Sequence, residues 1–127
     1  MVINMNSILD VNAETWEKEV IHSNILVLVD FWHNRCTYCL KLNPLLEEVS
    51  KEYEKRVKFV KLNVMESVQN KRTAIEHGVM GTPTLIFFCD KRSVGTFVGF
   101  QPKERLKQII DDMYDKYHKC IGSSTIL

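Results

Sequence analysis

The segment "FWHNRCTYCL", residues 31–40, places two cysteines, Cys36 and Cys39, two residues apart. It overlaps the end of "ILVLVDFW" (25–32), a continuous apolar and β-branched run that is typical of a strand covered on both faces. Downstream, apolar side chains recur with the period of an amphipathic helix, at Leu42, Leu45, Leu46, Val49 and Tyr53. The cysteine pair is therefore expected where a strand passes into a helix, and in open α/β sheets functional sites are built at such junctions.

Hydrophobic patterning elsewhere predicts one α/β domain over residues 1–127, with a frayed tail from about residue 119. Helices are expected at 12–22, from Thr37 onward with a kink at Pro44, at 66–77, and from Pro102 onward. Strands are expected at 25–32, 57–64, 84–89 and 93–100, with a further short strand near 7–10. This order predicts a central mixed β-sheet, parallel and then antiparallel, flanked by helices on both faces.

Composition and charge narrow the classes of protein that the chain can belong to. A length of 127 residues with 45% hydrophobic residues fits a single domain with a real core. The formal net charge of +1 gives no electrostatic argument for binding nucleic acid or an anionic membrane surface. The longest apolar run, "ILVLV", is too short to cross a bilayer, and the N-terminal segment lacks the pattern of a signal peptide. A cytoplasmic protein without a membrane or nucleic-acid partner is expected.

The expected junction gives the two cysteines different chemistry. Cys36 falls at the first turn of the helix, where free N–H groups and the positive end of the helix dipole favour a thiolate, and Arg35 adds a cation. Cys39 lies one turn further along and is expected to be more buried. We therefore predict that Cys36 attacks a disulfide as the nucleophile and that Cys39 then resolves the mixed disulfide.

Zinc binding and a purely structural disulfide are the two alternative roles for these cysteines. A structural zinc site needs four ligands, but Cys89 and Cys120 stand alone and no histidine has a second histidine at helical spacing, so no metal is expected. A purely structural Cys36–Cys39 bond is disfavoured in a reducing compartment. Cys89 and Cys120 themselves are expected to be a strand-end hydrophobe and a tail thiol, with a regulatory disulfide as the alternative.

Several further segments resemble the thioredoxin family in the right order and spacing. "VDFWHNRCTYC" is similar to its active-site segment, "GTPTLIFF" to its cis-proline loop and following strand, and "FVKLNV" to its third strand; "FVGF" and "CTYCLKLNPLLEEVSKEY" fit as well. The resemblance implies the thioredoxin fold and a thiol–disulfide oxidoreductase that reduces protein disulfides. It implies no cofactor beyond the redox-active Cys36–Cys39 disulfide, target proteins that contain disulfides, and a thioredoxin reductase as the electron donor.

The resemblance also implies roles for residues around the cysteine pair. Asp30 matches a buried aspartate that relays a proton to Cys39, and a carboxyl in an apolar run should have a raised pKa near the working pH. Lys61 matches a lysine that tunes this aspartate. The substrate-binding residues implied are Trp32 beside the disulfide, the cis-proline Pro83 with the Thr82 backbone free to pair with a peptide, and Gly81, Val98 and Gly99 along a flat apolar groove. One domain with so small a groove is expected to be a monomer.

Four residues depart from the family pattern and keep other functions open. The usual glycine–proline between the cysteines is replaced by Thr37–Tyr38, the usual preceding tryptophan by Arg35, and the usual following lysine by Leu40. No catalytic atom is lost, but the inter-cysteine dipeptide influences the redox potential. The alternative function is therefore a disulfide isomerase or oxidant, or a carrier dedicated to one partner. A non-catalytic binding module on the same fold is a less favoured alternative.

Overall fold

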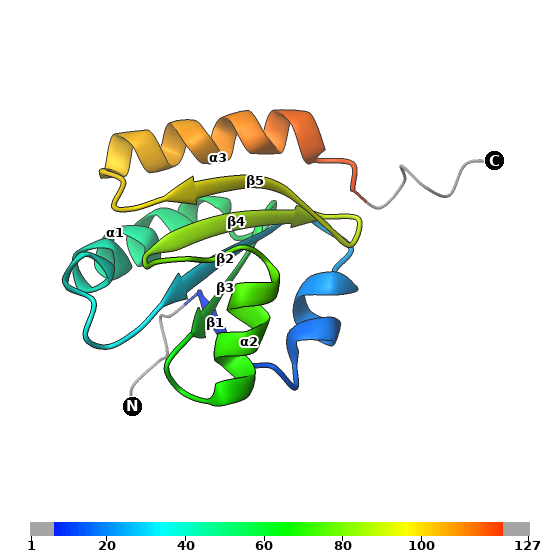
Figure 1. Ribbon diagram of the computed structural model, residues 1–127. Coiled ribbons are helices and arrows are strands. Elements are labelled where there is room, and N and C mark those ends of the chain that lie inside the picture. Colours follow the sequence, from blue (N-terminus) through cyan, green and yellow to red (C-terminus); the bar gives the residue numbers. More distant parts are fainter. Residues whose placement is uncertain (1–6, 121–127) are drawn as a thin grey trace, which may run out of the picture.

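The computed structural model describes residues 7–120 of the chain. Along the sequence it contains β1 (Leu9–Val11), the π-helix η1 (Glu17–Ile21), β2 (Val27–Trp32), α1 (Thr37–Tyr53), β3 (Lys58–Asn63), α2 (Val68–Glu76), β4 (Thr84–Cys89), β5 (Arg92–Val98) and α3 (Lys103–Tyr117) (Figure 1). No helix within residues 7–120 is both long enough and apolar enough to cross a membrane.

The five strands form one sheet in the order β1-β3-β2-β4-β5. β1, β3 and β2 run parallel, whereas β4 is antiparallel to β2 and β5 is antiparallel to β4. This arrangement confirms the mixed sheet, parallel and then antiparallel, that the sequence predicts. It also confirms the short first strand, although β1 lies two residues later than expected.

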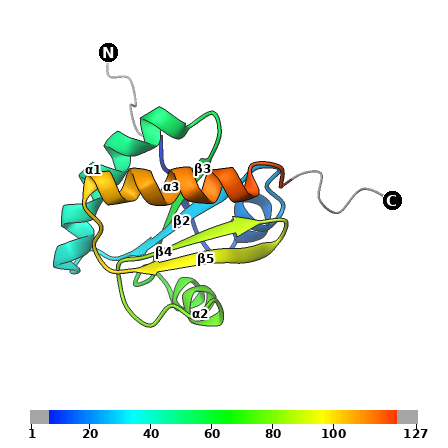
Figure 2. The same ribbon diagram turned by 90° about the horizontal axis from the view of Figure 1, so that it is seen from above.

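Helices cover both faces of the sheet, as predicted. α1 and α3 lie on one side of the strands and α2 on the other (Figure 2). The alternation along β2 follows these layers, because Leu28 packs with α1 and α3, whereas Val29 and Phe31 pack with Trp16 of the N-terminal segment and Ala74 of α2. Both faces of β2 are thus buried, which explains its uninterrupted apolar sequence.

The first predicted helix, at 12–22, is wrong in extent. Asn12 to Thr15 form a turn in which Asn12 Oδ1 accepts hydrogen bonds from the backbone N–H groups of Glu14 and Thr15. Asparagine caps a turn readily, and here its side chain replaces the first turn of the expected helix. Regular helix is left only at the five-residue η1.

A tight hairpin connects β4 and β5. Asp90 and Lys91 both have positive φ angles, of 53° and 71°, and Cys89 pairs directly with Arg92. A two-residue connection with both central residues in the left-handed region matches the right-handed twist of the flanking strands.

The first expectation for the two remaining cysteines, a strand-end hydrophobe and a separate tail thiol, is wrong, and the alternative of a disulfide between them agrees with the structure. Cys89 and Cys120 are joined by a disulfide bond, and both side chains are buried. Cys89 lies at a strand end and Cys120 is 31 residues later, near the end of the chain. No local sequence pattern indicates that they are paired, so the bond is apparent only in the tertiary structure. The predicted tail falls mostly in residues 121–127, outside the described residues, but Cys120 is part of the packed structure.

Candidate functional site

Cys36 is the N-cap residue of α1, and its extended backbone leads directly into the helix. Its Sγ accepts a hydrogen bond from the backbone N–H of Cys39 at 3.1 Å. The sulfur therefore occupies the position where an N-terminal helix group would otherwise lack a partner, at the positive end of the helix dipole. This local geometry stabilises negative charge on Cys36.

The two sulfurs of the pair are bonded but differ in access. Cys36 and Cys39 form a disulfide with a Cα–Cα distance of 5.2 Å. Cys36 is partly exposed, whereas Cys39 has 0% of its surface accessible. An incoming disulfide can therefore reach Cys36 but not Cys39.

Asp30 lies beneath the cysteine pair, on the face of β2 that α1 covers. Its side chain is 1% exposed, and burial raises its pKa to about 7, against a smaller opposing effect of the Lys61 ammonium group. The parallel register pairs Asp30 with Lys61 of β3, so the two side chains share a face. Asp30 Oδ1 has no hydrogen-bond partner among the described residues.

Lys61 is held beside this carboxyl by neighbours on both sides. Its Nζ lies 3.9 Å from Asp10 Oδ1 on β1 and 5.4 Å from the centre of the Trp32 ring. Lys61 thus lies between the exposed Asp10 and the buried Asp30, and its ammonium group opposes the effect of burial on the pKa of Asp30.

An open cavity of about 380 Å³ gives Asp30 a route to the surface. Its lining joins Asp30 and Lys61 of the sheet to one face of α1, and consists of Ile8, Asp30, Asn43, Pro44, Glu47, Lys51 and Lys61. The buried carboxyl thus borders an open space whose walls also carry the charged side chains Glu47, Lys51 and Lys61.

Asn43 is a site residue that the sequence did not reveal. With its amide nitrogen turned toward them, it donates hydrogen bonds to the Cys39 carbonyl oxygen at 3.0 Å and to Asp30 Oδ2 at 3.2 Å. It therefore bridges the helix that carries the cysteines and the strand that carries the buried acid. The sequence feature that could have pointed to Asn43 is its position seven residues, or about two helical turns, after Cys36, on the side of α1 that faces the sheet.

The proline loop lies at the same end of the sheet. The Thr82–Pro83 peptide bond is cis, and the Pro83 carbonyl accepts a hydrogen bond from Gly99 N–H at 2.8 Å. Thr84 pairs with Phe31 of β2 on one side and with Val98 of β5 on the other. This register brings together the predicted groove residues Gly81, Thr82, Pro83, Val98 and Gly99, close to the strand that leads into the cysteines.

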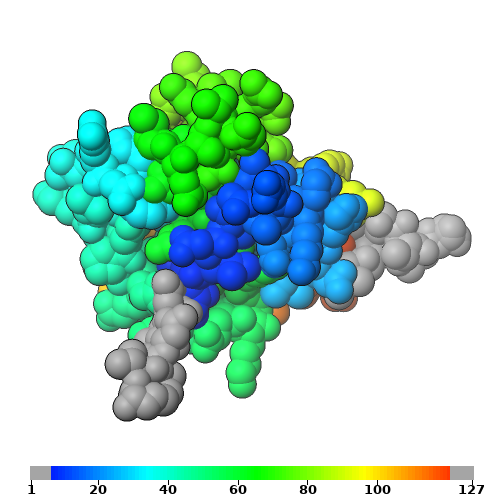
Figure 3. All heavy atoms as spheres, turned by 90° about the horizontal axis from the view of Figure 1, so that it is seen from below, coloured from blue at the N-terminus to red at the C-terminus, as the bar shows by residue number. Residues whose placement is uncertain are grey.

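Exposed apolar side chains extend the surface around this loop. Val98 is 70% exposed and Met80 is 99% exposed, while the Tyr38 ring between the cysteines lies 6.2 Å from Phe100, centre to centre. The cyan atoms of the cysteine loop lie against the green atoms of the α2 region (Figure 3), and a cavity of about 190 Å³ between them is lined by His33 and by Met80. The surface around the cysteines suits an apolar polypeptide segment.

The described residues contain no group of three His, Cys, Asp or Glu side chains that could hold a metal ion. A disulfide with one accessible sulfur at a helix N-terminus and a buried proton acceptor can exchange with a second disulfide or dithiol.

Comparison with known proteins agrees with this chemistry. The thioredoxin family model matches residues 7–112. Thioredoxin of Buchnera aphidicola subsp. Acyrthosiphon pisum is 38% identical over 108 residues, which cover 85% of this chain and 97% of the relative. Thioredoxin 1 of Synechococcus elongatus is 39% identical over 101 residues (80% and 92%), and a Staphylococcus aureus thioredoxin is 45% identical over 84 residues (66% and 78%). The chain belongs to the thioredoxin family and is a thiol–disulfide oxidoreductase of the kind that reduces protein disulfides.

Proposed function

We propose that Cys36 is the attacking sulfur and Cys39 the resolving sulfur of this oxidoreductase. The Cys36 thiolate attacks one sulfur of a target disulfide, forms a mixed disulfide and releases the first target thiol. Cys39 then attacks Cys36 Sγ, releases the second target thiol and closes the Cys36–Cys39 bond, so that two electrons pass to the target. The observation that carries this assignment is the asymmetry of the pair. Cys36 is accessible and receives the Cys39 N–H at 3.1 Å, whereas Cys39 is fully buried.

Asp30 takes the proton that Cys39 must lose before it can attack. Its pKa of about 7, raised by burial, gives it comparable protonated and ionised populations near neutral pH, as an acid–base group requires. The cavity that reaches Asp30 lets the proton pass onward to solvent, and Lys61 tunes the acid by opposing its burial. These two residues complete the proposed catalytic group of four with Cys36 and Cys39.

The proline loop forms the binding surface for the target. An extended segment of the target pairs with the Thr82 backbone as an added strand, flanked by Gly81, Pro83, Val98 and Gly99, with Trp32 beside the disulfide. The exposed Val98 supports an apolar contact at this edge. The targets are disulfide-containing proteins, and a thioredoxin reductase returns the electrons.

The enzyme is further proposed to be a cytoplasmic monomer that uses the Cys36–Cys39 disulfide and no bound cofactor. Its balanced charge and the small size of the groove support a single chain that meets targets transiently. Size-exclusion chromatography with light scattering should give the mass of one chain, and a dimer would contradict the monomer.

Thr37–Tyr38 supports a second function, that of a disulfide oxidant or isomerase, because this dipeptide forms the first turn of α1 next to the Cys36 sulfur. A redox titration of Cys36–Cys39 against a thiol–disulfide buffer, read by alkylation of these two cysteines, separates the candidates. A reductant should have a potential below about −230 mV, and an oxidant one near −120 mV. Exchange of Thr37–Tyr38 for glycine–proline is the matched control, since it alters the dipeptide alone.

Asn43 is proposed as a positioning residue that fixes Asp30 relative to Cys39. Its amide favours the ionised carboxylate, so Asn43→Ala should raise the pKa of Asp30 and shift the pH profile of disulfide reduction about one unit toward alkaline pH. The profile is measured as kcat/KM from pH 5 to 9. Leu40→Ala removes an exposed side chain from the first turns of α1 and should leave the profile in place. An unchanged profile for Asn43→Ala would contradict the assignment.

A further inference from the structure

We propose that the Cys89–Cys120 disulfide is structural: it fastens the end of α3 to the end of β4 and stays oxidised while Cys36 and Cys39 exchange. The proposal goes beyond the catalytic cycle and does not depend on which catalytic sulfur attacks first. It rests on where the two sulfurs lie, how they are shielded, and how far they are from the catalytic pair.

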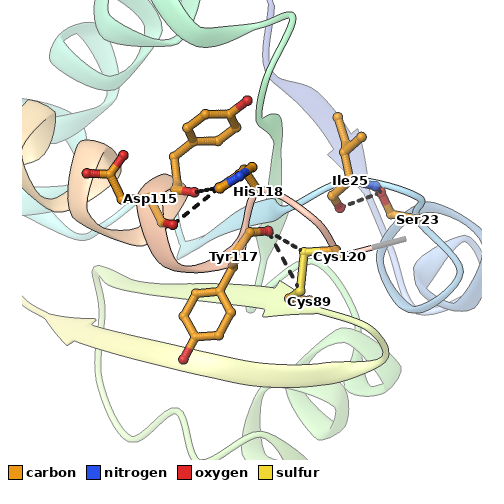
Figure 4. The surroundings of a disulfide bond; sticks show 8 residues. Ser23, Ile25, Cys89, Asp115, Tyr117, His118 and Cys120 are labelled. Atoms are coloured by element: carbon orange, nitrogen blue, oxygen red, sulfur yellow. Dashed lines mark hydrogen bonds between the residues drawn. A yellow bond between two sulfur atoms is a disulfide. The ribbon is translucent and has the colours of Figure 1, made fainter. Parts of the chain in front are cut away.

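Cys89 and Cys120 meet at the junction of two elements that are distant in the sequence. Cys89 is the last residue of β4, and Cys120 follows the end of α3 by three residues. Their Cα atoms are 5.4 Å apart, within the range of natural disulfides (Figure 4). A covalent bond here closes a loop that contains the whole of β5 and α3.

The surroundings of the two sulfurs accept either redox state. The carbonyl oxygen of Tyr117, in the last turn of α3, lies 2.8 Å from Cys120 Sγ and 3.9 Å from Cys89 Sγ (Figure 4). A carbonyl at a helix C-terminus has no following N–H within the helix, so it can accept a thiol proton from a reduced cysteine. Opening the bond therefore does not require the site to be rebuilt.

α3 is already seated closely on the hairpin that Cys89 terminates. A Cβ atom on Gly95 of β5 would lie 2.7 Å from Met113 Cε, the end of a flexible side chain, so the Met113 side chain of α3 packs directly on the backbone of this strand. Leu106, Ile109 and Ile110 bury the rest of its inner face. The disulfide extends this contact past the last apolar turn, where the helix would otherwise end without an anchor.

Shielding separates this bond from thiol–disulfide exchange in solution. Cys89 is 8% exposed and Cys120 is 4% exposed, whereas Cys36 is partly open to solvent. Exchange needs in-line access of a thiolate to one of the sulfurs, which burial denies. Low-molecular-weight thiols should therefore reduce Cys36–Cys39 first, and the shielded Cys89–Cys120 bond should persist in a reducing cytoplasm, where an accessible structural disulfide is disfavoured.

The Cys89–Cys120 bond is also far from the Cys36–Cys39 pair of the same molecule. Cys89 lies at the end of β4 opposite to the proline loop, and the five-residue step from Thr84 spans about 17 Å at the usual rise of a strand. Cys36 and Cys39 cannot reach it. The bond forms when the two thiols pass two electrons and two protons to a disulfide oxidant, such as oxidised glutathione, which leaves as two thiols.

Alkylation of the oxidised full-length protein tests the proposal. The protein is exposed to dithiothreitol, trapped with N-ethylmaleimide at intervals, and mapped by mass spectrometry. Native protein should gain two labels, on Cys36 and Cys39, with reduction of Cys89–Cys120 slower by a factor on the order of a hundred, whereas protein in guanidinium chloride should gain all four. Free Cys89 and Cys120 thiols before reduction, or labelling of all four cysteines together, would overturn the proposal.

A paired substitution tests the structural role. Cys89→Ser with Cys120→Ser keeps two groups that can donate to the Tyr117 carbonyl but removes the covalent bond, and should lower Tm by about 10 °C without reductant. Wild-type protein reduced at all four cysteines is compared with the variant reduced at Cys36 and Cys39, and the two should melt at the same temperature. Disulfide-reducing activity at 25 °C should stay within twofold of wild type; an unchanged Tm or a large loss of activity would overturn the structural role.

Discussion

Cys36→Ser is expected to lower disulfide reduction by a factor on the order of a thousand or more. A serine hydroxyl at the start of α1 remains protonated at neutral pH, so it supplies no nucleophile to the target disulfide. The helix N-terminus, which receives the Cys36 sulfur in hydrogen-bond contact with Cys39 N–H, cannot compensate for that loss. The measurement is kcat/KM for reduction of a protein disulfide, with folding checked by circular dichroism.

Cys39→Ser is the matched control, because it leaves the attacking sulfur intact. This variant should also fail to turn over, but it should accumulate a covalent complex with its target through Cys36, visible on a non-reducing gel and dissolved by dithiothreitol. The assigned order of attack would be reversed if Cys36→Ser kept full activity, or if Cys36→Ser, and not Cys39→Ser, accumulated the covalent complex, through Cys39.

Asp30→Asn is expected to stabilise the protein at neutral and alkaline pH while slowing it as an enzyme. Burial raises the pKa of Asp30 from 3.8 to about 7, so the folded state binds a proton more tightly than the unfolded state. Wild-type stability should therefore fall as pH rises from about 4 to about 7 and level off above, by roughly 2–4 kcal/mol in total. Asparagine carries no charge, so the variant should lose this dependence.

Urea unfolding at pH 4.5 and at pH 8 measures the effect. The gain from Asp30→Asn should be present at pH 8 and small at pH 4.5, and kcat/KM should fall about tenfold because no group is left to accept the Cys39 proton. Asp10→Asn removes an exposed carboxylate from the same row of the sheet, two strands away from Asp30, and should change stability by less than about 1 kcal/mol. Equal gains at both pH values would show that packing, and not the buried charge, is responsible.

Local sequence was sufficient for much of the fold and for part of the site. The apolar run before Cys36 and the helical period after it predict β2 and α1, and the junction between them predicts the unequal environments of Cys36 and Cys39. Asp30 was singled out by its match to the buried aspartate of the thioredoxin family, and its place inside this apolar run agrees with its burial. These features depend on residues close together in the sequence, where the spacing of apolar side chains indicates both the secondary structure and the buried face.

Features that depend on contacts between distant elements could not be derived in this way. Asn43 has an ordinary place on a helix, and its role appears only when α1 is laid across β2. The Cys89–Cys120 bond joins a strand end to a chain end, and cysteine spacing alone does not determine connectivity. The turn at Asn12 was missed because Trp16 and Val20 have helical spacing, while the asparagine side chain favours a competing local structure.

The Cys89–Cys120 bond also sets the mechanical load path of the molecule. In the oxidised protein, a pull applied beyond Cys120 passes through the sulfur bridge to the end of β4. The force then meets the ladders that join β4 to β2 and β5, while the chain segment from β5 through α3 carries no tension. In the reduced protein the same pull would peel α3 from the sheet first. The rupture force of this enzyme in a pulling experiment should therefore report the redox state of a bond that its catalytic cycle never touches.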